Sequence, residues 1–291
     1  ALTSGDNNVA VGQNALGANT TGNNNTGVGL SALVANTTGG SNVALGAVSL
    51  STNTDGSNNT GVGYAALKLN STGARNTGLG RNALTANTTA DDNVAVGDLA
   101  MNNNTTGATN VAVGAQALEA NTTASDNVAV GYKALEANTT GGDNIAIGSQ
   151  SLLVNTTGGD NVSIGTDAMQ SNTTGADNVA IGKDCMLANT EGVNNVAMGN
   201  ISLIANTTGS RNTAIGAESM NDNTTADNNT AIGYASLSKN TTGTSNTALG
   251  WAALEVNTTA SNNIAVGHAA ARSNTTGTRI TAIGYAALDG Q

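Results

Sequence analysis

A glycine recurs every seventeen residues from Gly12 to Gly284, without one insertion or deletion. With this glycine as position 1, the repeating unit reads G-x-x-[AS]-[LM]-x-x-N-T-T-G-x-x-N-[VT]-A-[VIL]. A strict short period is the signature of a repeat architecture, in which each unit is stable only against its neighbours. We therefore expect residues 1–291 to form a single uninterrupted repeat array rather than one or two globular domains.

The composition supports an ordered repeat and excludes several classes of protein. The chain has no Pro, no Phe and 10% charged residues, and Val, Ile and Leu return at fixed positions, which is unlike a disordered chain. The net charge of −10 and the scattered Lys and Arg argue against nucleic acid as a partner. Apolar runs such as residues 144–147 are too short to span a bilayer, so we expect no membrane insertion.

The unit is too short for a pair of helices and suits β-strands. Position 15 is β-branched, position 16 is small and position 17 is a large aliphatic residue, as in residues 93–97, and this alternation predicts a strand. A second strand is expected over positions 3 to 6, for example residues 133–136. The large residues at positions 5 and 17 are expected to form the core. The fold class is then all-β, a parallel β-solenoid of about seventeen 17-residue coils.

Two features of the unit concern its turns and its small residues. Asn at positions 8 and 14 is expected to adopt the left-handed conformation at corners and to form stacked amide ladders. The glycines at positions 1 and 11 are expected at tight bends. The small residues at positions 4 and 16 have two interpretations: they face outward beneath a covering chain, or they face inward into a very thin core.

The repeat resembles a known family. Residues 127–131 (NVAVG) and 178–182 (NVAIG) look like the repeats of YadA-like head domains in trimeric autotransporter adhesins. The longer phrase in residues 233–250 is similar to arrays in phage and bacterial tail-fibre-like proteins. The resemblance implies a left-handed β-roll, often trimeric, displayed on a cell or virion surface for adhesion or as a fibre shaft.

Candidate ligand sites are few. Asp126, Asp143, Asp160 and Asp177 occupy position 13 in consecutive coils, where stacked carboxylates favour either solvated side chains or a bound Ca²⁺. Tyr234, Trp251 and His268 share position 2 and are a candidate glycan-binding edge, unless position 2 is only a permissive corner. Thr at positions 9 and 10 is similar to ice-binding arrays but lies in a turn. Cys185 is expected only to pack. We predict no cofactor, no catalytic residues and no enzyme activity.

The leading functional hypothesis is an extracellular structural fibre protein whose subunits stack head to tail, with other copies of itself as partners, in single, trimeric or bundled form. Ala1 falls at repeat position 7 and Gln291 at position 8, so the junction is expected to involve the residues Ala1, Leu2, Thr3, Asp289, Gly290 and Gln291. The alternative is an adhesin or tail-fibre module that binds surface glycans.

Overall fold

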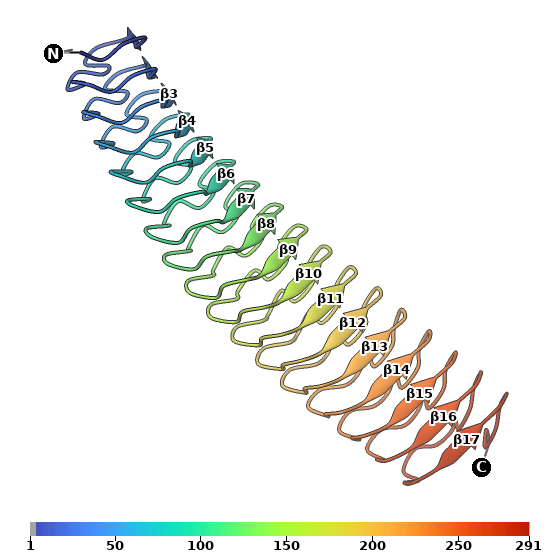
Figure 1. Ribbon diagram of the computed structural model, residues 1–291. Coiled ribbons are helices and arrows are strands. Elements are labelled where there is room, and N and C mark those ends of the chain that lie inside the picture. Colours follow the sequence, from blue (N-terminus) through green and yellow to red (C-terminus); the bar gives the residue numbers. More distant parts are fainter. Residues whose placement is uncertain (1–3, 291) are drawn as a thin grey trace. The chain divides into compact units, whose positions relative to one another are not determined.

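A computed structural model describes residues 4–290 and contains β-strands but no helix in that range. It divides into two compact units, Ala1–Asp143 and Asn144–Gln291. Each coil contributes one three-residue strand, shown in Figure 1. The strands of the first unit are β1 (Val9–Val11), β2 (Thr26–Val28), β3 (Val43–Leu45), β4 (Thr60–Val62), β5 (Thr77–Leu79), β6 (Val94–Val96), β7 (Val111–Val113) and β8 (Val128–Val130). Those of the second are β9 (Ile145–Ile147), β10 (Val162–Ile164), β11 (Val179–Ile181), β12 (Val196–Met198), β13 (Thr213–Ile215), β14 (Thr230–Ile232), β15 (Thr247–Leu249), β16 (Ile264–Val266) and β17 (Thr281–Ile283).

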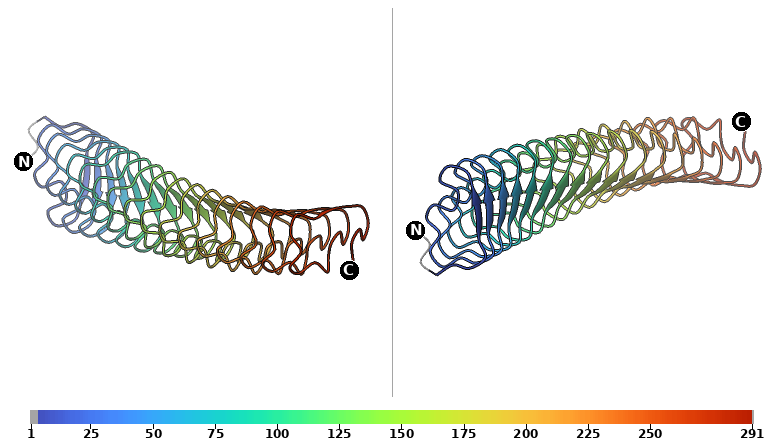
Figure 2. Two further views of the ribbon diagram at one scale, coloured as in Figure 1. Left: turned by 90° about the horizontal axis from the view of Figure 1, so that it is seen from below. Right: turned by 90° about the horizontal axis from the view of Figure 1, so that it is seen from above.

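Strands of successive coils are parallel and pair one coil apart in both units. Val9 pairs with Thr26 in the first unit, and Val162 pairs with Val179 in the second. Figure 2 shows the strand arrows of neighbouring coils side by side within each unit. The predicted all-β parallel β-solenoid is confirmed, and the period of seventeen is the length of one coil.

The core differs from the expected one in one of its two large columns. Position 5 is buried, as predicted, and Leu33, Leu84 and Met169 have no exposed surface. Position 17 instead faces outward, and Leu45, Leu79 and Ile147 are 48%, 43% and 38% exposed. The middle residue of each strand points inward, so position 16 is the buried one. An alternating three-residue strand fits either orientation, and here the narrow interior accepts only the small side chain.

The small residues at position 4 are also buried. Ala32, Ala83 and Cys185 have no exposed surface, like Ala95 and Ala180 at position 16. The structure thus selects the interpretation of a thin core, in which each Leu or Met at position 5 packs among small side chains. The other interpretation, an outward small-residue face beneath a partner, is wrong.

The second predicted strand, over positions 3 to 6, is absent from the described coils. Position 3 and position 5 both adopt the left-handed conformation, as at Lys133 (φ 56°) and Leu135 (φ 56°). That conformation costs a side chain such as Leu roughly 1–2 kcal/mol. It turns the backbone so that position 5 donates its N–H to the next coil, as Leu84 does to the carbonyl of Ala100 at 3.0 Å. The segment is therefore a turn with hydrogen bonds between coils rather than a strand.

The glycine at position 1 makes the expected tight bend. Gly97 has φ +138°, and an added Cβ would lie 2.5 Å from the carbonyl oxygen of Gly114 in the next coil. Only glycine fits both the backbone angle and the close approach of the next coil. This requirement explains why the column never varies.

The two asparagine columns form the predicted ladders in the core, but they are not the left-handed residues. The left-handed positions are 3, 5 and 13, so that part of the prediction was wrong. At position 8, Asn36 donates its side-chain N–H to Oδ1 of Asn19 at 2.8 Å and to the carbonyl of Gly39 at 2.9 Å. At position 14, Asn42 Oδ1 accepts the backbone N–H of Asn59 at 2.9 Å, and Asn42 Nδ2 donates to the carbonyl of Gly56 at 2.8 Å. Each position 14 side chain thus clamps its own coil to the next one, and we call this pair of bonds the position 14 clamp.

Exchange of Leu84 for Ala is expected to lower the free energy of unfolding by about 2–5 kcal/mol, because it opens a cavity in the core. The same exchange at Leu79, five residues earlier and 43% exposed, is expected to cost less than about 1 kcal/mol. Chemical denaturation, followed by circular dichroism on unassociated protein, measures both values. Equal losses would show that position 17 belongs to the core after all.

Removal of one position 14 clamp is expected to be as costly as a core cavity. Asn59→Ala deprives the backbone N–H of Asn76 of its acceptor at 3.0 Å and the carbonyl of Gly73 of a donor at 2.7 Å. Because buried groups without partners cost about 1–3 kcal/mol each, the loss should be roughly 2–4 kcal/mol. Asn103→Ala, at an exposed position where other coils carry Ala, is the control. A shift in the denaturation midpoint no larger than that of the control contradicts the role of the clamp.

Candidate functional site

The side chains that carry charge or aromatic rings lie on the corners of the coils, outside the asparagine ladders. No pocket hollows the surface of the described residues. No helix among residues 4–290 is long and apolar enough to cross a membrane. The candidate sites are therefore groups of side chains that lie one above another in neighbouring coils. Three such groups differ in their chemistry, with aromatic rings in the first, carboxylates in the second and ion pairs in the third.

The first column is an aromatic ladder at position 2 in the second unit, formed by Tyr234, Trp251, His268 and Tyr285. The ring centroids of neighbouring coils lie 6.4, 4.6 and 5.1 Å apart, and the interplanar angles are 20°, 13° and 15°. Arg272 lies over the Trp251 ring at 5.5 Å and is held by Glu255 at 2.6 Å. A hydrogen bond with Glu218 raises the pKa of Tyr234. The sequence analysis predicted that Tyr234, Trp251 and His268 lie on one edge in adjacent coils, and their rings do stack. Tyr285 extends the ladder by one coil.

The stacking changes what this candidate glycan edge offers. Sugars bind aromatic side chains by lying on the flat face of a ring, and the inner rings of the ladder turn their faces to one another. Their edges are what remains for solvent. Tyr285, which is 81% exposed, is the ring with the most open surface among the four. The ladder is therefore better suited to joining its coils than to presenting Trp251 to a sugar.

The second column is the acidic run at position 13. All four aspartates adopt the left-handed conformation and are exposed. In the first unit Asp126 accepts a hydrogen bond from Thr109 at 2.5 Å. The described residues contain no group of three or more His, Cys, Asp or Glu side chains that could hold a metal ion. The structure thus gives the calcium hypothesis no further support, and the carboxylates lie in solvent.

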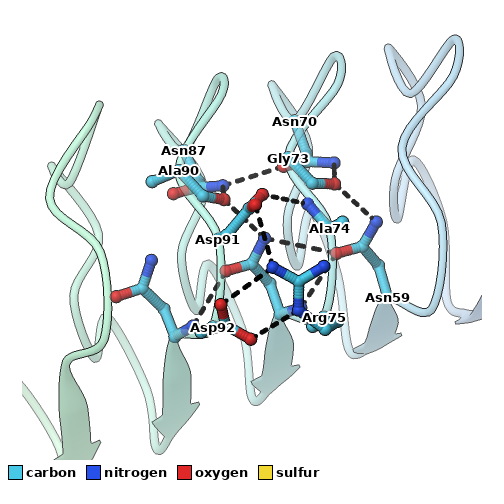
Figure 3. Close-up of polar contacts among 11 residues, drawn as sticks. Asn59, Asn70, Gly73, Ala74, Arg75, Asn87, Ala90, Asp91 and Asp92 are labelled. Atoms are coloured by element: carbon cyan, nitrogen blue, oxygen red, sulfur yellow. Dashed lines mark hydrogen bonds and ion pairs between the residues drawn. The ribbon is translucent and has the colours of Figure 1, made fainter.

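The third group of side chains lies at positions 12 and 13 of two neighbouring coils. It joins these coils by ion pairs and was not predicted from the sequence. Arg75 at position 13 contacts Asp92 in the next coil through Nε at 2.7 Å and through Nη2 at 2.9 Å. The same Nη2 lies 3.0 Å from Asp91, whose other oxygen accepts the backbone N–H of Ala74 at 2.7 Å. Figure 3 shows this cluster beside the buried amides of Asn59 and Asn70. Hydrogen bonds from Arg75 hold the pKa of Asp92 below its ordinary value, and those from Asp92 raise the pKa of Arg75.

The remaining predicted residues are Cys185 and those of the expected junction. Cys185 is buried, its Sγ lies 3.3 Å from the carbonyl of Ala197, and burial raises the pKa of its thiol to about 12, in agreement with a packing role. Asp289 accepts a hydrogen bond from Ser273 at 2.9 Å, and Gly290 is exposed with φ 87°. The other predicted junction residues, Ala1, Leu2, Thr3 and Gln291, lie outside the described residues.

Comparison of the sequence with protein-family models and with curated proteins found no match. The class of protein is therefore defined by the fold alone. The chain is a parallel β-solenoid repeat protein, with one three-residue strand and two buried asparagines in the standard coil.

The aromatic ladder is expected to stabilise the coils that carry it. Trp251→Ala removes two ring contacts, each worth about 0.5–1.5 kcal/mol, and the arginine contact, worth about 0.5–1 kcal/mol, so amide exchange in β15 to β17 should accelerate roughly 10- to 1,000-fold. Tyr64→Ala is the control, because Tyr64 is flanked at position 2 by Ala47 and Arg81 and lacks a ring neighbour there. Hydrogen exchange read by mass spectrometry compares the two variants. Equal acceleration around both sites would mean that stacking contributes nothing beyond the side chain itself.

Proposed function

We propose that this protein is the structural subunit of an extracellular fibre, in which copies of the chain stack head to tail and pack side by side. The observation that carries the proposal is the outward face of the strands. Positions 15 and 17 form two rows of exposed and half-buried side chains on this face, which we call the aliphatic face. Its members include Val43 (39% exposed), Leu45 (48%), Ile145 (36%), Ile147 (38%), Met198 (39%) and Leu249 (43%).

The composition of this face is unusual for a surface in contact with water. Position 15 alternates between Val or Ile and Thr, but position 17 is aliphatic or Met in every strand from β1 to β17. Folding does not require this, because position 17 lies outside the core. Contiguous exposed apolar rows typically mark a protein–protein contact. Burial of such rows would contribute about 25 cal/mol per Å² of apolar surface removed from water.

A second copy of the same chain is the partner that fits the aliphatic face best. The rows repeat at the spacing of stacked strands, about 4.8 Å, and a partner must match that spacing over many coils to bury all of them. An identical solenoid has the same spacing by construction. The face also carries no charged residue, since positions 15 and 17 of the strands are only Val, Ile, Leu, Met or Thr.

The parallel pairing of the strands is compatible with stacking along the solenoid axis. Successive coils pair at one register in both units, so each coil presents the same backbone donors and acceptors to the next. A head-to-tail contact between copies that repeats this pairing would not close on itself and would generate a filament. The proposed setting, outside the cell or on a cell or virion surface, follows the resemblance to adhesin and tail-fibre repeats.

The adhesin alternative has weaker support. Its best candidate site was the edge around Trp251, and the ring faces there stack on one another. Electron microscopy of the purified chain tests the leading proposal, with filaments as the expected result. Dispersed single particles at every concentration and ionic strength would overturn it.

Side-by-side packing is expected to depend on position 17. The triple variant Ile147→Thr, Ile164→Thr, Ile181→Thr replaces three consecutive members of the position 17 row in the second unit and should weaken lateral association at least about tenfold, or about 1.4 kcal/mol. Its control is Leu153→Thr, Leu187→Thr, Ile204→Thr, which makes equivalent changes at half-buried position 6, where Thr85 occurs naturally. Sedimentation velocity and filament width in micrographs give the comparison. Lateral association that is unchanged in the first variant, or lost equally in both, contradicts the proposed face.

A further inference from the structure

In the first unit, charged residues lie on both sides of the aliphatic face at one place. Positions 14 and 16 are buried, so the outer side of each coil carries positions 13, 15, 17 and 2 in this order. Positions 13 and 2 precede and follow the strand, and we call them the margins of the aliphatic face. Both margins of β5 carry arginine, at Arg75 and Arg81, and both margins of β6 carry aspartate, at Asp92 and Asp98.

These four charges are paired within the chain and are nevertheless open to solvent. Arg75 contacts Asp92 at 2.7 Å, and the two side chains are 53% and 43% exposed. Arg81 contacts Asp98 at 2.8 Å, and these side chains are 57% and 44% exposed. Figure 3 shows the first of the two pairs. Exposed ion pairs contribute about 0–1 kcal/mol to folding, and each charge here keeps an open side for a further partner.

We infer that the aliphatic faces of two first units pack on each other, with the two solenoids running in opposite directions about a two-fold axis between β5 and β6. This inference rests on the side-by-side packing of the proposed function and names its direction and register. The axis lies parallel to the strands, so β5 of one copy faces β6 of the other, and each position faces the same position. Arg75 then faces Asp92 of the second copy, and Arg81 faces Asp98. The symmetry repeats both pairs, which gives four ion pairs between the copies.

Other arrangements of the two faces bring like charges together. An axis through β5 places Arg75 against Arg75, and an axis through β6 places Asp92 against Asp92. Two copies that run in the same direction and in register have position 13 facing position 2, so Arg75 meets Arg81 and Asp92 meets Asp98. Like charges placed opposite each other are destabilising. A shift by one coil in that direction forms two favourable pairs instead of four.

Both tyrosines of the first unit fit the same axis. β4 of one copy faces β7 of the other, which places Tyr64 against Ala115. β3 faces β8, which places Ala47 against Tyr132. Each large ring thus lies opposite a small side chain, and the two tyrosines do not collide. Tyr64 and Tyr132 are exposed in the single chain, and Tyr is a residue type that interfaces favour.

The two rows of the aliphatic face match in the same register. Position 15 of β3 to β8 includes two threonines, Thr60 and Thr77, and they face Val111 and Val94 of the second copy. No threonine lies opposite another, and position 17 is aliphatic on both sides throughout. Sheets packed face to face lie about 10 Å apart, a distance that the long arginine side chains help to bridge. Burial of the rows supplies affinity, while the charged margins select direction and register.

Charge reversal in two separate variants tests the margins. The acidic variant, Arg75→Asp with Arg81→Asp, makes all four sites negative, and the basic variant, Asp92→Arg with Asp98→Arg, makes them positive. Each variant alone is expected to weaken side-by-side association at least about tenfold, as measured by sedimentation velocity. An equimolar mixture should restore association, because each strand then faces the opposite charge on the other chain. Circular dichroism checks that both variants are folded.

Matched controls make the same changes in charge at exposed sites away from the aliphatic face. Lys68→Asp with Lys239→Asp is the acidic control, at positions 6 and 7, and Asp55→Arg with Glu191→Arg is the basic control, at position 10. Both controls should associate like the unaltered chain. Since the net charge is already −10, a general effect of charge would weaken the acidic variant and strengthen the basic one. The effect of the margins should shrink in 1 M salt, where screening acts over about 3 Å.

Cross-linking reads the direction of packing independently. In a background with Cys185→Ser, a mixture of Asn58→Cys chains and Thr109→Cys chains should be joined by a short bismaleimide, because β4 faces β7. A mixture of Asn58→Cys and Tyr64→Cys chains should not, since these sites face each other only when the copies run in the same direction.

Unaltered chains that never associate side by side would refute the packing itself. Association that both charge variants retain, or that their mixture fails to restore, would refute only the proposed register. Cross-links found in the Asn58 and Tyr64 mixture, and not in the Asn58 and Thr109 mixture, would refute the opposite direction of the two copies.

Discussion

Buried amides that bind from one coil to the next hold this solenoid together. Position 14 uses its side-chain oxygen and nitrogen toward the following coil, and position 8 uses its amide both within its turn and along its column. Because these amides have no exposed surface, a missing partner leaves a polar group in the core, which costs more than the bond itself contributes. Coils must therefore stack at one register, seventeen residues apart. The asparagine columns fix that register more strictly than apolar packing could.

The same constraint explains the thin core and the strained turn. With asparagine side chains filling two columns, the remaining interior holds one large residue in each coil, such as Leu84, between small residues at positions 4 and 16. Two left-handed residues, at positions 3 and 5, are needed to turn the chain over so short a distance. Their conformational cost is offset by bonds to neighbouring coils, such as that from Leu84 to Ala100. A single coil would carry the strain without those bonds, so the fold is stable only as an array.

Features of the fold that depend on the seventeen-residue period could be predicted from the sequence, whereas the direction in which a side chain points could not. The coil length, the parallel strands and the amide ladders followed from identical residues recurring at fixed spacing. The outward direction of Leu79 could not be predicted from the sequence. A strand of three alternating residues is too short for its pattern to show which of its two faces is buried. The segment around Leu135 was predicted to be a strand but is a turn, because nothing in the local sequence indicates that a Leu will adopt the left-handed conformation. The pair of Arg75 and Asp91 was missed because the columns were compared one at a time, whereas the contact joins position 13 of one coil to position 12 of the next.

The outward direction of position 17, which the sequence analysis did not predict, bears directly on the proposed function. An aliphatic residue in the core needs no further explanation, but a column that faces outward, as Leu45 does at 48% exposed, and is never polar does. Ser and Thr would satisfy the fold at that position, as Thr does at position 15 of β2 and β13. The solenoid is already stabilised by its amide ladders and its Leu column, so the aliphatic face adds little to folding and is free for association. Register is thus fixed inside the coil by asparagine, and the proposed contacts between copies would use side chains that the core does not need.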